Sequence, residues 1–316
     1  MKSMENIAEM TKREVFFQIK SKSYLCMSAL LILIVLLHMS NLYHAVLKNY
    51  QDYIRTKQMY VDDGMDILEE LEKDNVVYEN QNSRISNNPI KEDYTNLAVS
   101  IQNIEPLNVV SNTYEYFLFV FGTLIFGIYS AYVATYDFKF KTFKVISASY
   151  SQNEIIIGKI CSLFFFQFLS MVCMAVMAWG LSFPVKHLVS GKVPINEYSI
   201  PMPEHTGRIA LQFIFVMATL ILYTIIGFSI GYIAKNMLPV TFLLFLYTLL
   251  IPVLGAYDLK NIVSYFAHKI FDFQSQFVIF DPVGISAFWG IVVLVSIAAL
   301  LLLSVKIISL KRSRYD

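Results

Sequence analysis

Charged residues are scarce in this chain. Only 16% of its 316 residues are Asp, Glu, Lys or Arg, whereas 56% are hydrophobic, and soluble domains usually carry about 25% charged residues. Long apolar runs must therefore face something other than water. The formal net charge is only +1, so no overall excess of positive charge favours nucleic acid as a partner.

Reactive motifs are also missing. The three cysteines, Cys26, Cys161 and Cys173, lie within or at the edge of apolar runs, which argues against a disulfide framework and against a CxxC metal site. Both Gly-Lys pairs, at 158–159 and 191–192, lack the first glycine and the following Ser or Thr of a GxxxxGK[ST] loop. No HExxH or GxSxG occurs. We therefore expect no ATP hydrolysis by the chain itself, no enzymatic activity and no cofactor or metal of its own.

Six apolar segments are long enough to cross a hydrocarbon core, which takes about 20 helical residues. Their predicted ranges are 24–46, 115–136, 155–181, 209–234, 238–257 and 285–305. A closed barrel would need alternating strands of about 10 residues, which these uniformly apolar runs do not resemble. The sequence predicts an all-α integral membrane protein with six transmembrane helices. Pro252 with Gly255 should kink or end the fifth span.

The orientation follows from short basic segments. Lysines and arginines concentrate in 1–23, in the loop 137–154, at Lys235 and in the tail 306–316. All four segments share one side if there are six crossings, and basic loops stay on the cytoplasmic side. Both termini should therefore be cytoplasmic. The chain holds no Asn-x-Ser/Thr sequon, which fits a bacterial protein, so we expect a multi-pass protein of the bacterial cytoplasmic membrane.

Three segments fall on the external side. Segment 47–114 is acidic between 62 and 74; its first half is typical of a helix that leaves the membrane, and its second half carries turn signals. We expect a small, partly helical external domain, or alternatively a solvated acidic loop without a ligand. The segments 182–208, rich in proline, and 258–284, rich in aromatic residues, complete this side. The latter composition suits interfacial helices.

Residues 1–23 form a predicted amphipathic helix. Its apolar side and its charged side are separated at helical spacing; the apolar side holds Met4, Ile7, Ala8, Thr11, Val15 and Ile19. Such a basic amphipathic helix suits the inner membrane surface. The alternative is a loosely ordered basic tail that only fixes the topology.

Ionisable residues are nearly missing from the spans. No Asp or Glu lies centrally in a span, and Asp137 and Arg208 stand at span ends, where side chains are expected to reach water. Coupled carriers usually place ionisable groups at membrane depth. The free energy for transport should therefore enter from a partner.

A few polar residues remain as candidates for the transport pathway. In the first span, His38, Asn41 and His44 form a polar stripe that suits a metal or proton site, a water-facing lining or helix packing. Gln167 and Gln212 are expected to hydrogen-bond to neighbouring helices. Gly227 and Gly231 form a GxxxG pair for close helix approach, within one subunit or between two.

The loop between the second and third spans carries the most informative pattern. Its candidate partner-coupling residues, from the acidic residue at the span exit to the turn before the next span, are Asp137, Lys139, Lys141, Thr142, Lys144, Val145, Ile146, Ser149 and Gln152. A short helix here can transmit rigid-body motion of a docked partner into two spans. The alternative is an ordinary basic loop that sets topology.

This pattern resembles the coupling loop of permeases of type-2 ATP-binding-cassette (ABC) transporters, which runs as an acidic residue, Gly-Thr, a basic residue, an aliphatic pair, Ser-Pro-Ser-Arg and Gly-Lys. Asp137, Thr142, Lys144 and the pair 145–146 match, as does Gly-Lys at 158–159, while Ser149 and Gln152 stand where Pro and Arg are usual. The amphipathic N-terminus, six spans and external insert match by architecture.

The resemblance implies a permease subunit of an exporter. Such subunits work as dimers, with a second copy or a paralogue, beside cytoplasmic ABC ATPase subunits that bind ATP and magnesium. Relatives move antimicrobial peptides, lipid-linked sugars, drugs or sodium, so the substrate does not follow from the fold. The acidic external domain and the many Phe, Tyr and Met residues favour a cationic amphipathic substrate such as a peptide.

Two other functions remain open from the sequence. A self-contained ion channel or secondary carrier would transport without an ATPase. A membrane immunity or signalling subunit would bind a peptide externally without moving it.

Overall fold

The protein is helical apart from one short hairpin. The computed structural model describes residues 2–80, 83–200, 206–273 and 279–312. The described elements in chain order are α1 (Lys2–Lys20), α2 (Ser23–Asp62), α3 (Ile67–Glu72), β1 (Val77–Asn80), β2 (Ser83–Ser86), α4 (Pro89–Gln102), α5 (Pro106–Tyr116), the π-helix η1 (Phe117–Gly122), α6 (Thr123–Lys139), α7 (Phe143–Ser147), α8 (Gln152–Ser190), the 3₁₀ turns η2 (Ile195–Glu197) and η3 (Thr206–Arg208), α9 (Ile209–Ala234), α10 (Met237–Phe245), the π-helix η4 (Leu246–Leu250), α11 (Leu259–Ala267) and α12 (Ala287–Arg312).

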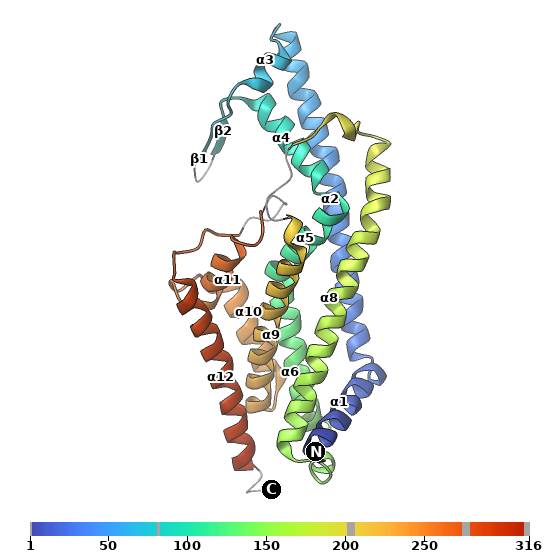
Figure 1. The fold of residues 1–316 in the computed structure, drawn as a ribbon, viewed down its shortest axis with the longest axis vertical. Coiled ribbons are helices and arrows are strands. Elements are labelled where there is room, and N and C mark those ends of the chain that lie inside the picture. Colours follow the sequence, from blue (N-terminus) through green and yellow to red (C-terminus); the bar gives the residue numbers. More distant parts are fainter. Residues whose placement is uncertain (1, 81–82, 201–205, 274–278, 313–316) are drawn as a thin grey trace.

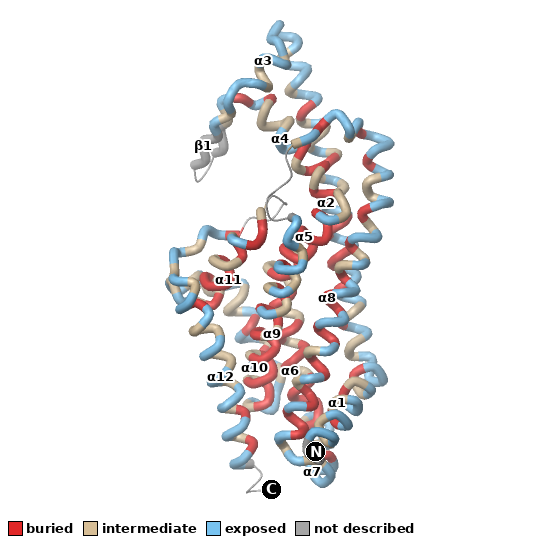
Figure 2. The backbone as a smooth tube through the Cα atoms, in the orientation of Figure 1, coloured by how far each residue is buried: buried red, intermediate tan, exposed pale blue. Residues whose placement is uncertain are grey.

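Among the described residues, five helical segments are long and apolar enough to cross a membrane, which agrees with the all-α membrane class predicted from the sequence. They are Ser23–Asp62, Pro106–Lys139, Gln152–Ser190, Ile209–Ala234 and Ala287–Lys311. They run side by side, and both chain ends lie at the same end of the bundle (Figure 1). Figure 2 shows the buried residues concentrated in the central helices, while α12 and the outward face of α8 are largely exposed.

The predicted span 238–257 is not one long helix. The apolar helix covers only Met237–Leu250, about 20 Å at 1.5 Å per residue, against about 30 Å for a hydrocarbon core. Ile251 leaves the helix in an extended conformation, because the residue before a proline is disfavoured in the α region. The expectation that Pro252 ends this span is confirmed, and the expectation of a helix reaching Tyr257 is wrong.

Other helix bounds also differ from the predicted ranges. The helix that contains the predicted second span begins earlier, at Pro106, because Pro106 occupies the first turn of α5 after an extended Glu105. The third continues through Pro184 to Ser190, so the predicted loop 182–208 starts helical. The last runs from Ala287 to Arg312 and takes in most of the predicted tail.

The segment predicted as an external domain is mostly helical. α2 continues unbroken to Asp62 over 40 residues, about 60 Å and twice the hydrocarbon thickness. α4 packs back along α2. The strands β1 and β2, which lie between α3 and α4 in the chain, pair antiparallel, with Val77 opposite Ser86. The ring of Tyr198, which follows η2, lies 5.5 Å from that of Tyr53 and 5.8 Å from that of Tyr94. These tyrosines close a small core at this end of the molecule.

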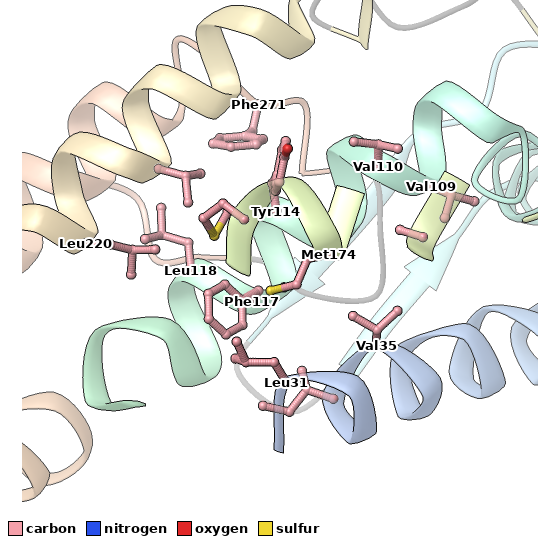
Figure 3. Packing of buried hydrophobic residues seen from close by; sticks show 14 of the residues in the cluster. Leu31, Val35, Val109, Val110, Tyr114, Phe117, Leu118, Met174, Leu220 and Phe271 are labelled. Atoms are coloured by element: carbon pink, nitrogen blue, oxygen red, sulfur yellow. The ribbon is translucent and has the colours of Figure 1, made fainter. Parts of the chain in front are cut away.

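The centre of the bundle is a close contact between α6 and α9. A Cβ atom on Gly227 would lie 2.0 Å from the carbonyl oxygen of Gly127, and one on Gly231 would lie 3.1 Å from the Cα of Ala131. The Gly227–Gly231 pair therefore packs within the chain. Beside this contact, apolar side chains of α2, α5, η1, α8 and α9 interlock, with Leu118 and Met174 among them (Figure 3).

Helix α1 is amphipathic, as predicted, but it has three faces. Met4 is 77% exposed, and Phe16 and Ile19 are also exposed. The face turned into the protein instead carries Glu14 and Gln18, both fully buried. The sequence pattern identified the apolar and charged faces and missed this third one.

Candidate coupling site

The loop after α6 is shaped by its first acidic residue. Asp137 accepts a hydrogen bond from the Thr142 hydroxyl at 2.7 Å, and its carbonyl accepts the Thr142 N–H at 3.0 Å. Between them Lys141 takes a positive φ of 59°, a left-handed conformation that reverses the chain. The helix α7 then begins directly after Thr142.

Helix α7 presents one face outward and one face inward. Lys144 is exposed, and Val145 is 72% exposed. Ile146 is buried in a small apolar cluster with Met10 of α1 and Ile155 of α8. The predicted loop residues thus divide into a core anchor, Ile146, and an outward surface of Lys144 and Val145.

The remaining predicted coupling residues border this surface. Lys139, Lys141, Thr142 and Ser149 are exposed, and Gln152 is half-buried at the start of α8. A hollow of about 460 Å³ opens beside α7; it is lined by Lys144, Gln152 and neighbours on the loop, and by the end of α12 at 309–310. Two distant parts of the chain therefore meet at this surface.

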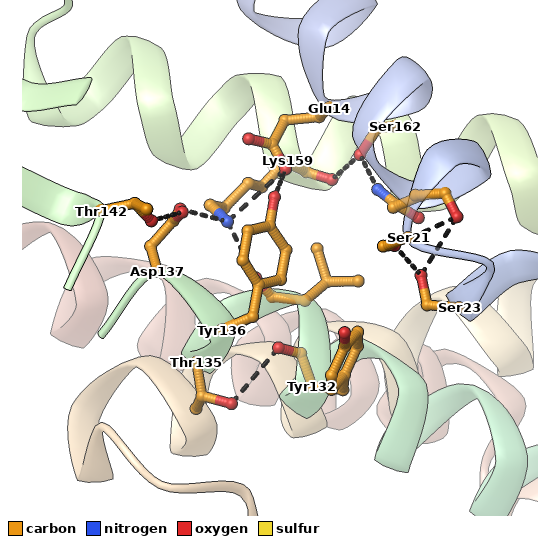
Figure 4. Close-up of polar contacts among 12 residues, drawn as sticks. Glu14, Ser21, Ser23, Tyr132, Thr135, Tyr136, Asp137, Thr142, Lys159 and Ser162 are labelled. Carbon is orange, nitrogen blue, oxygen red and sulfur yellow. Dashed lines mark hydrogen bonds and ion pairs between the residues drawn. The ribbon is translucent and has the colours of Figure 1, made fainter. Parts of the chain in front are cut away.

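Behind the loop lies a buried group of ionisable side chains (Figure 4). The Lys159 ammonium lies 2.7 Å from Asp137 Oδ2 and 3.5 Å from Glu14 Oε2, and all three side chains are at most 3% exposed. Lys159 Nζ also donates to the carbonyl of Val133 at 2.9 Å. The expectation that Asp137 reaches water is wrong: it faces inward, because Lys159 and Thr142 supply partners there.

An aromatic ring completes this group. The ring of Tyr136 lies with its centroid 3.7 Å from Lys159 Nζ, a cation–π contact. The Tyr136 hydroxyl donates to Glu14. Glu14, Asp137 and Lys159, which we call the ionic triad, thus join α1, α6 and α8 in one contact. Removing one member of such a buried group leaves an uncompensated charge and is strongly destabilising.

A second polar layer joins the same three helices. Gln18 Nε2 of α1 donates to Ser162 Oγ of α8 at 2.8 Å, and the Tyr129 hydroxyl of α6 donates to Gln18 Oε1 at 2.6 Å. Each of these side chains is buried. Buried polar groups cannot bond to water, so each of these side chains needs the others as hydrogen-bond partners. These contacts therefore fix the relative position of the three helices.

The first turn of α8 is tied to α1 as well. Ser151 and Glu154 form a capping box, which satisfies free N–H groups at the helix start. Glu154 Oε1 also accepts from Asn6 Nδ2 at 2.9 Å. Just beyond, a Cβ atom on Gly158 would lie 2.6 Å from Met10 Cγ, so only glycine lets α1 approach this closely. The loop, α1, α6 and α8 are therefore one tightly linked unit.

No known protein family, curated protein or solved structure matches this chain.

The predicted pathway residues in the first span do not converge. His38 is buried and stacks on Tyr116 with ring centroids 4.8 Å apart, whereas Asn41 and His44 are exposed. Three residues of an α-helix turn by about 300°, so each of these side chains points about 60° away from the one before it. The described part of the chain holds no group of three His, Cys, Asp or Glu residues that fits a metal ion.

The two glutamines behave as expected. Gln167 Nε2 donates to the carbonyl of Met217 at 3.2 Å, and Gln167 Oε1 accepts from the Thr224 hydroxyl at 3.0 Å. Gln212 Nε2 donates to the carbonyl of Ile270, just after α11, at 3.2 Å. Both side chains are buried, and these hydrogen bonds connect α8 to α9 and α9 to the segment after α11.

Sequence reasoning missed Glu14, Gln18 and the role of Lys159. Met10, Glu14 and Gln18 repeat every four residues, a spacing that places them on one helix face. A second signal is the opposite charge of Asp137 and Lys159 at the same ends of two spans. These two patterns place Glu14 and Gln18 on one face and put opposite charges at neighbouring span ends, but the sequence does not show that these groups are buried or that they meet.

Proposed function

We propose that this chain is the permease subunit of an ATP-driven exporter in a bacterial cytoplasmic membrane, powered by a separate cytoplasmic ABC ATPase. The observation that carries the proposal is the outward surface of α7 mounted on the linked unit of α1, α6 and α8. A force on Lys144 and Val145 would reach two spanning helices through the chain itself and through the ionic triad. A loop that served only topology would need neither the buried anchor Ile146 nor the triad.

In this proposal the chain crosses the membrane six times. The short helix Met237–Leu250 would be completed by the non-helical residues 251–258. Such backbone is tolerated at membrane depth only where protein covers it, so this segment, which is partly exposed in the single chain, would need cover from the second permease subunit. The observation that both termini lie at one end of the bundle (Figure 1) supports an even number of crossings. That end, which also holds α7, would be cytoplasmic.

The external end supports an amphipathic cationic cargo. Near the acidic stretch 62–74, Met59 is 55% and Leu68 is 74% exposed. Apolar side chains among carboxylates match a peptide that carries both basic and apolar groups. The proposed permease would therefore work with a second copy or a paralogue to export such a peptide.

Site-specific photo-crosslinking in native membranes tests the partnership. A benzoylphenylalanine at Val145 should capture an ABC ATPase, which mass spectrometry identifies by its nucleotide-binding motifs. The matched control is Val176, which is 62% exposed on the outer surface of α8, where lipid is expected. Capture of an ATPase from position 145 but not from 176 supports the proposal; lipid or no protein from both positions contradicts it.

A further inference from the structure

A second site lies away from α7, at a pocket that both π-helices of the described chain help to line. A pocket of about 260 Å³ is lined by residues of η1, α6, α9, η4, α11 and the segment after residue 278. π-helical turns are rare and occur often at functional sites. Here η1 contributes Leu118 and Phe119, and η4 contributes Thr248.

The polar groups of this pocket come from four different elements. Thr123, Tyr223, Thr248 and Lys260 all line it, and the other lining residues are apolar. The hydroxyl of Thr248 is buried and has no hydrogen-bond partner among the described residues. A buried hydroxyl without a partner is unfavourable, so a bound ligand that supplies an oxygen would satisfy it.

Lys260 gives the pocket its charge. Its ammonium donates to the carbonyl of Ile251 at 2.6 Å and lies 4.9 Å from the centroid of the Tyr247 ring. An ammonium carries three donors, and these contacts use one of them in a hydrogen bond. The remaining donors, with the hydroxyls of Thr248 and Tyr223, fit an oxyanion.

The neighbouring carboxylate of Asp258 is bound by other donors. Asp258 accepts hydrogen bonds from the Tyr247 hydroxyl and from the N–H groups of Leu254 and Lys260 at 2.9 Å each. It lines the adjoining groove and not the pocket. Its charge is therefore already stabilised by three donors, and none of the pocket's lining residues is acidic.

The pocket is preformed and adjoins an apolar groove. Asn261 bonds both the carbonyl of Ala256 at 2.7 Å and the N–H of Val283 at 2.8 Å, which holds the segment carrying Phe280 against α11. Tyr223 lines the pocket and also the groove, which has a volume of about 860 Å³ and is bordered by α9, α10 and α12. A polar pocket beside an apolar groove matches a ligand with an anionic head and an apolar tail.

We propose that this site binds an anionic membrane lipid, with the head-group phosphate at Lys260 and Thr248 and the acyl chains in the groove beside Tyr223. The head group finds a cation and hydroxyl donors there, and the chains remain on the membrane-facing side of the bundle. The inference does not depend on the ATPase partnership, because the site is formed by this chain alone.

Native mass spectrometry of the purified chain in an uncharged detergent tests the site. Dioleoyl phosphatidylglycerol should bind at least tenfold more tightly than dioleoylglycerol, which has the same chains and no phosphate. Lys260→Gln should weaken phosphatidylglycerol binding at least tenfold, and Thr248→Val or Tyr223→Phe about threefold each. Equal binding of the two lipids, or unchanged binding in all three variants, would overturn the proposal.

The chain offers close controls. Lys269 lies just after α11, and its ammonium is 4.1 Å from the centroid of the Tyr265 ring, but it does not line the pocket. Thr241 bonds to its own helix at the carbonyl of Met237. Lys269→Gln and Thr241→Val should bind the lipid within twofold of the parent, and an equal loss would assign the effect to general charge or folding. Displacement of the lipid by millimolar inorganic phosphate would assign the site to the free anion and contradict a lipid.

Discussion

Replacing Lys159 by methionine should destabilise the protein far more than a comparable change at the surface. The substitution keeps an unbranched side chain, one heavy atom shorter, and removes the positive charge from a group in which every member is at most 3% exposed. Asp137 and Glu14 then lose their common cation. Breaking a buried ion pair from one side costs about 3–5 kcal/mol, so the thermal midpoint should fall by roughly 6–15 °C.

The matched control is Lys186→Met. Lys186 lies 2.6 Å from Glu105, but both side chains are about one-third exposed, and exposed pairs contribute about 0–1 kcal/mol. The assay is thermal unfolding of both variants in the same detergent, followed by tryptophan fluorescence. Equal losses in the two variants would show that the triad is not a buried contact.

The same reasoning predicts a rescue. If Lys159→Met destabilises the protein because two buried carboxylates lose their cation, adding Glu14→Gln and Asp137→Asn should recover most of the stability. Replacing every member of a buried ion group by an uncharged residue often changes the stability little. The triple variant would still lack the ionic link between α1, α6 and α8. If the triple variant is less stable than the single one, the electrostatic explanation is refuted.

Three further predictions follow from single contacts. Gly227→Ala should lower the melting temperature, because the new Cβ would lie 2.0 Å from the carbonyl oxygen of Gly127 and would force α6 away from α9. Gly180→Ala, whose Cβ meets nothing within 4 Å, should leave the melting temperature nearly unchanged. Equal changes in the two variants would contradict this packing. Val145→Asp should reduce co-purification of the ATPase while thermal stability stays within 2 °C or so, because the side chain is exposed; unchanged co-purification argues against docking at α7. Burial raises the pKa of Tyr198 to about 12, so the small tyrosine core around it should be stable below about pH 10 and lose stability as the pH rises toward 12. An ultraviolet difference titration against Tyr198→Phe should show that this phenol ionises near pH 12, and a pKa near 10 would contradict the prediction.

The sequence was sufficient for the parts of the fold that depend on composition. Apolar runs predicted the five long helices, and Pro252 predicted where the shorter one ends. Hydropathy did not reveal that this helix is too short to span, because the apolar run continues past Leu250 through Ile251, Val253 and Leu254. Only the restriction imposed by the proline distinguishes them.

The surroundings of α7, the candidate coupling site, were predictable in outline and not in their interior. The loop pattern located α7 and identified Asp137, but a single carboxylate at a span end gives no sign of whether its partner is water or a lysine. Glu14 and Gln18 belong to a helix with clear apolar and charged faces, so inward-facing polar residues are indistinguishable from solvent-facing ones without the position of α8. Their partners lie more than a hundred residues away in the chain.

Transport by reconstituted vesicles tests the central claim most directly. The chain alone, and the chain with its co-purified ATPase, are placed in proteoliposomes, and movement of a labelled cationic amphipathic peptide and of protons is followed. We predict peptide transport only with the ATPase and Mg-ATP, and no flux from the lone chain under a proton or voltage gradient. Gradient-driven flux through the lone chain would contradict a permease that receives its work through α7.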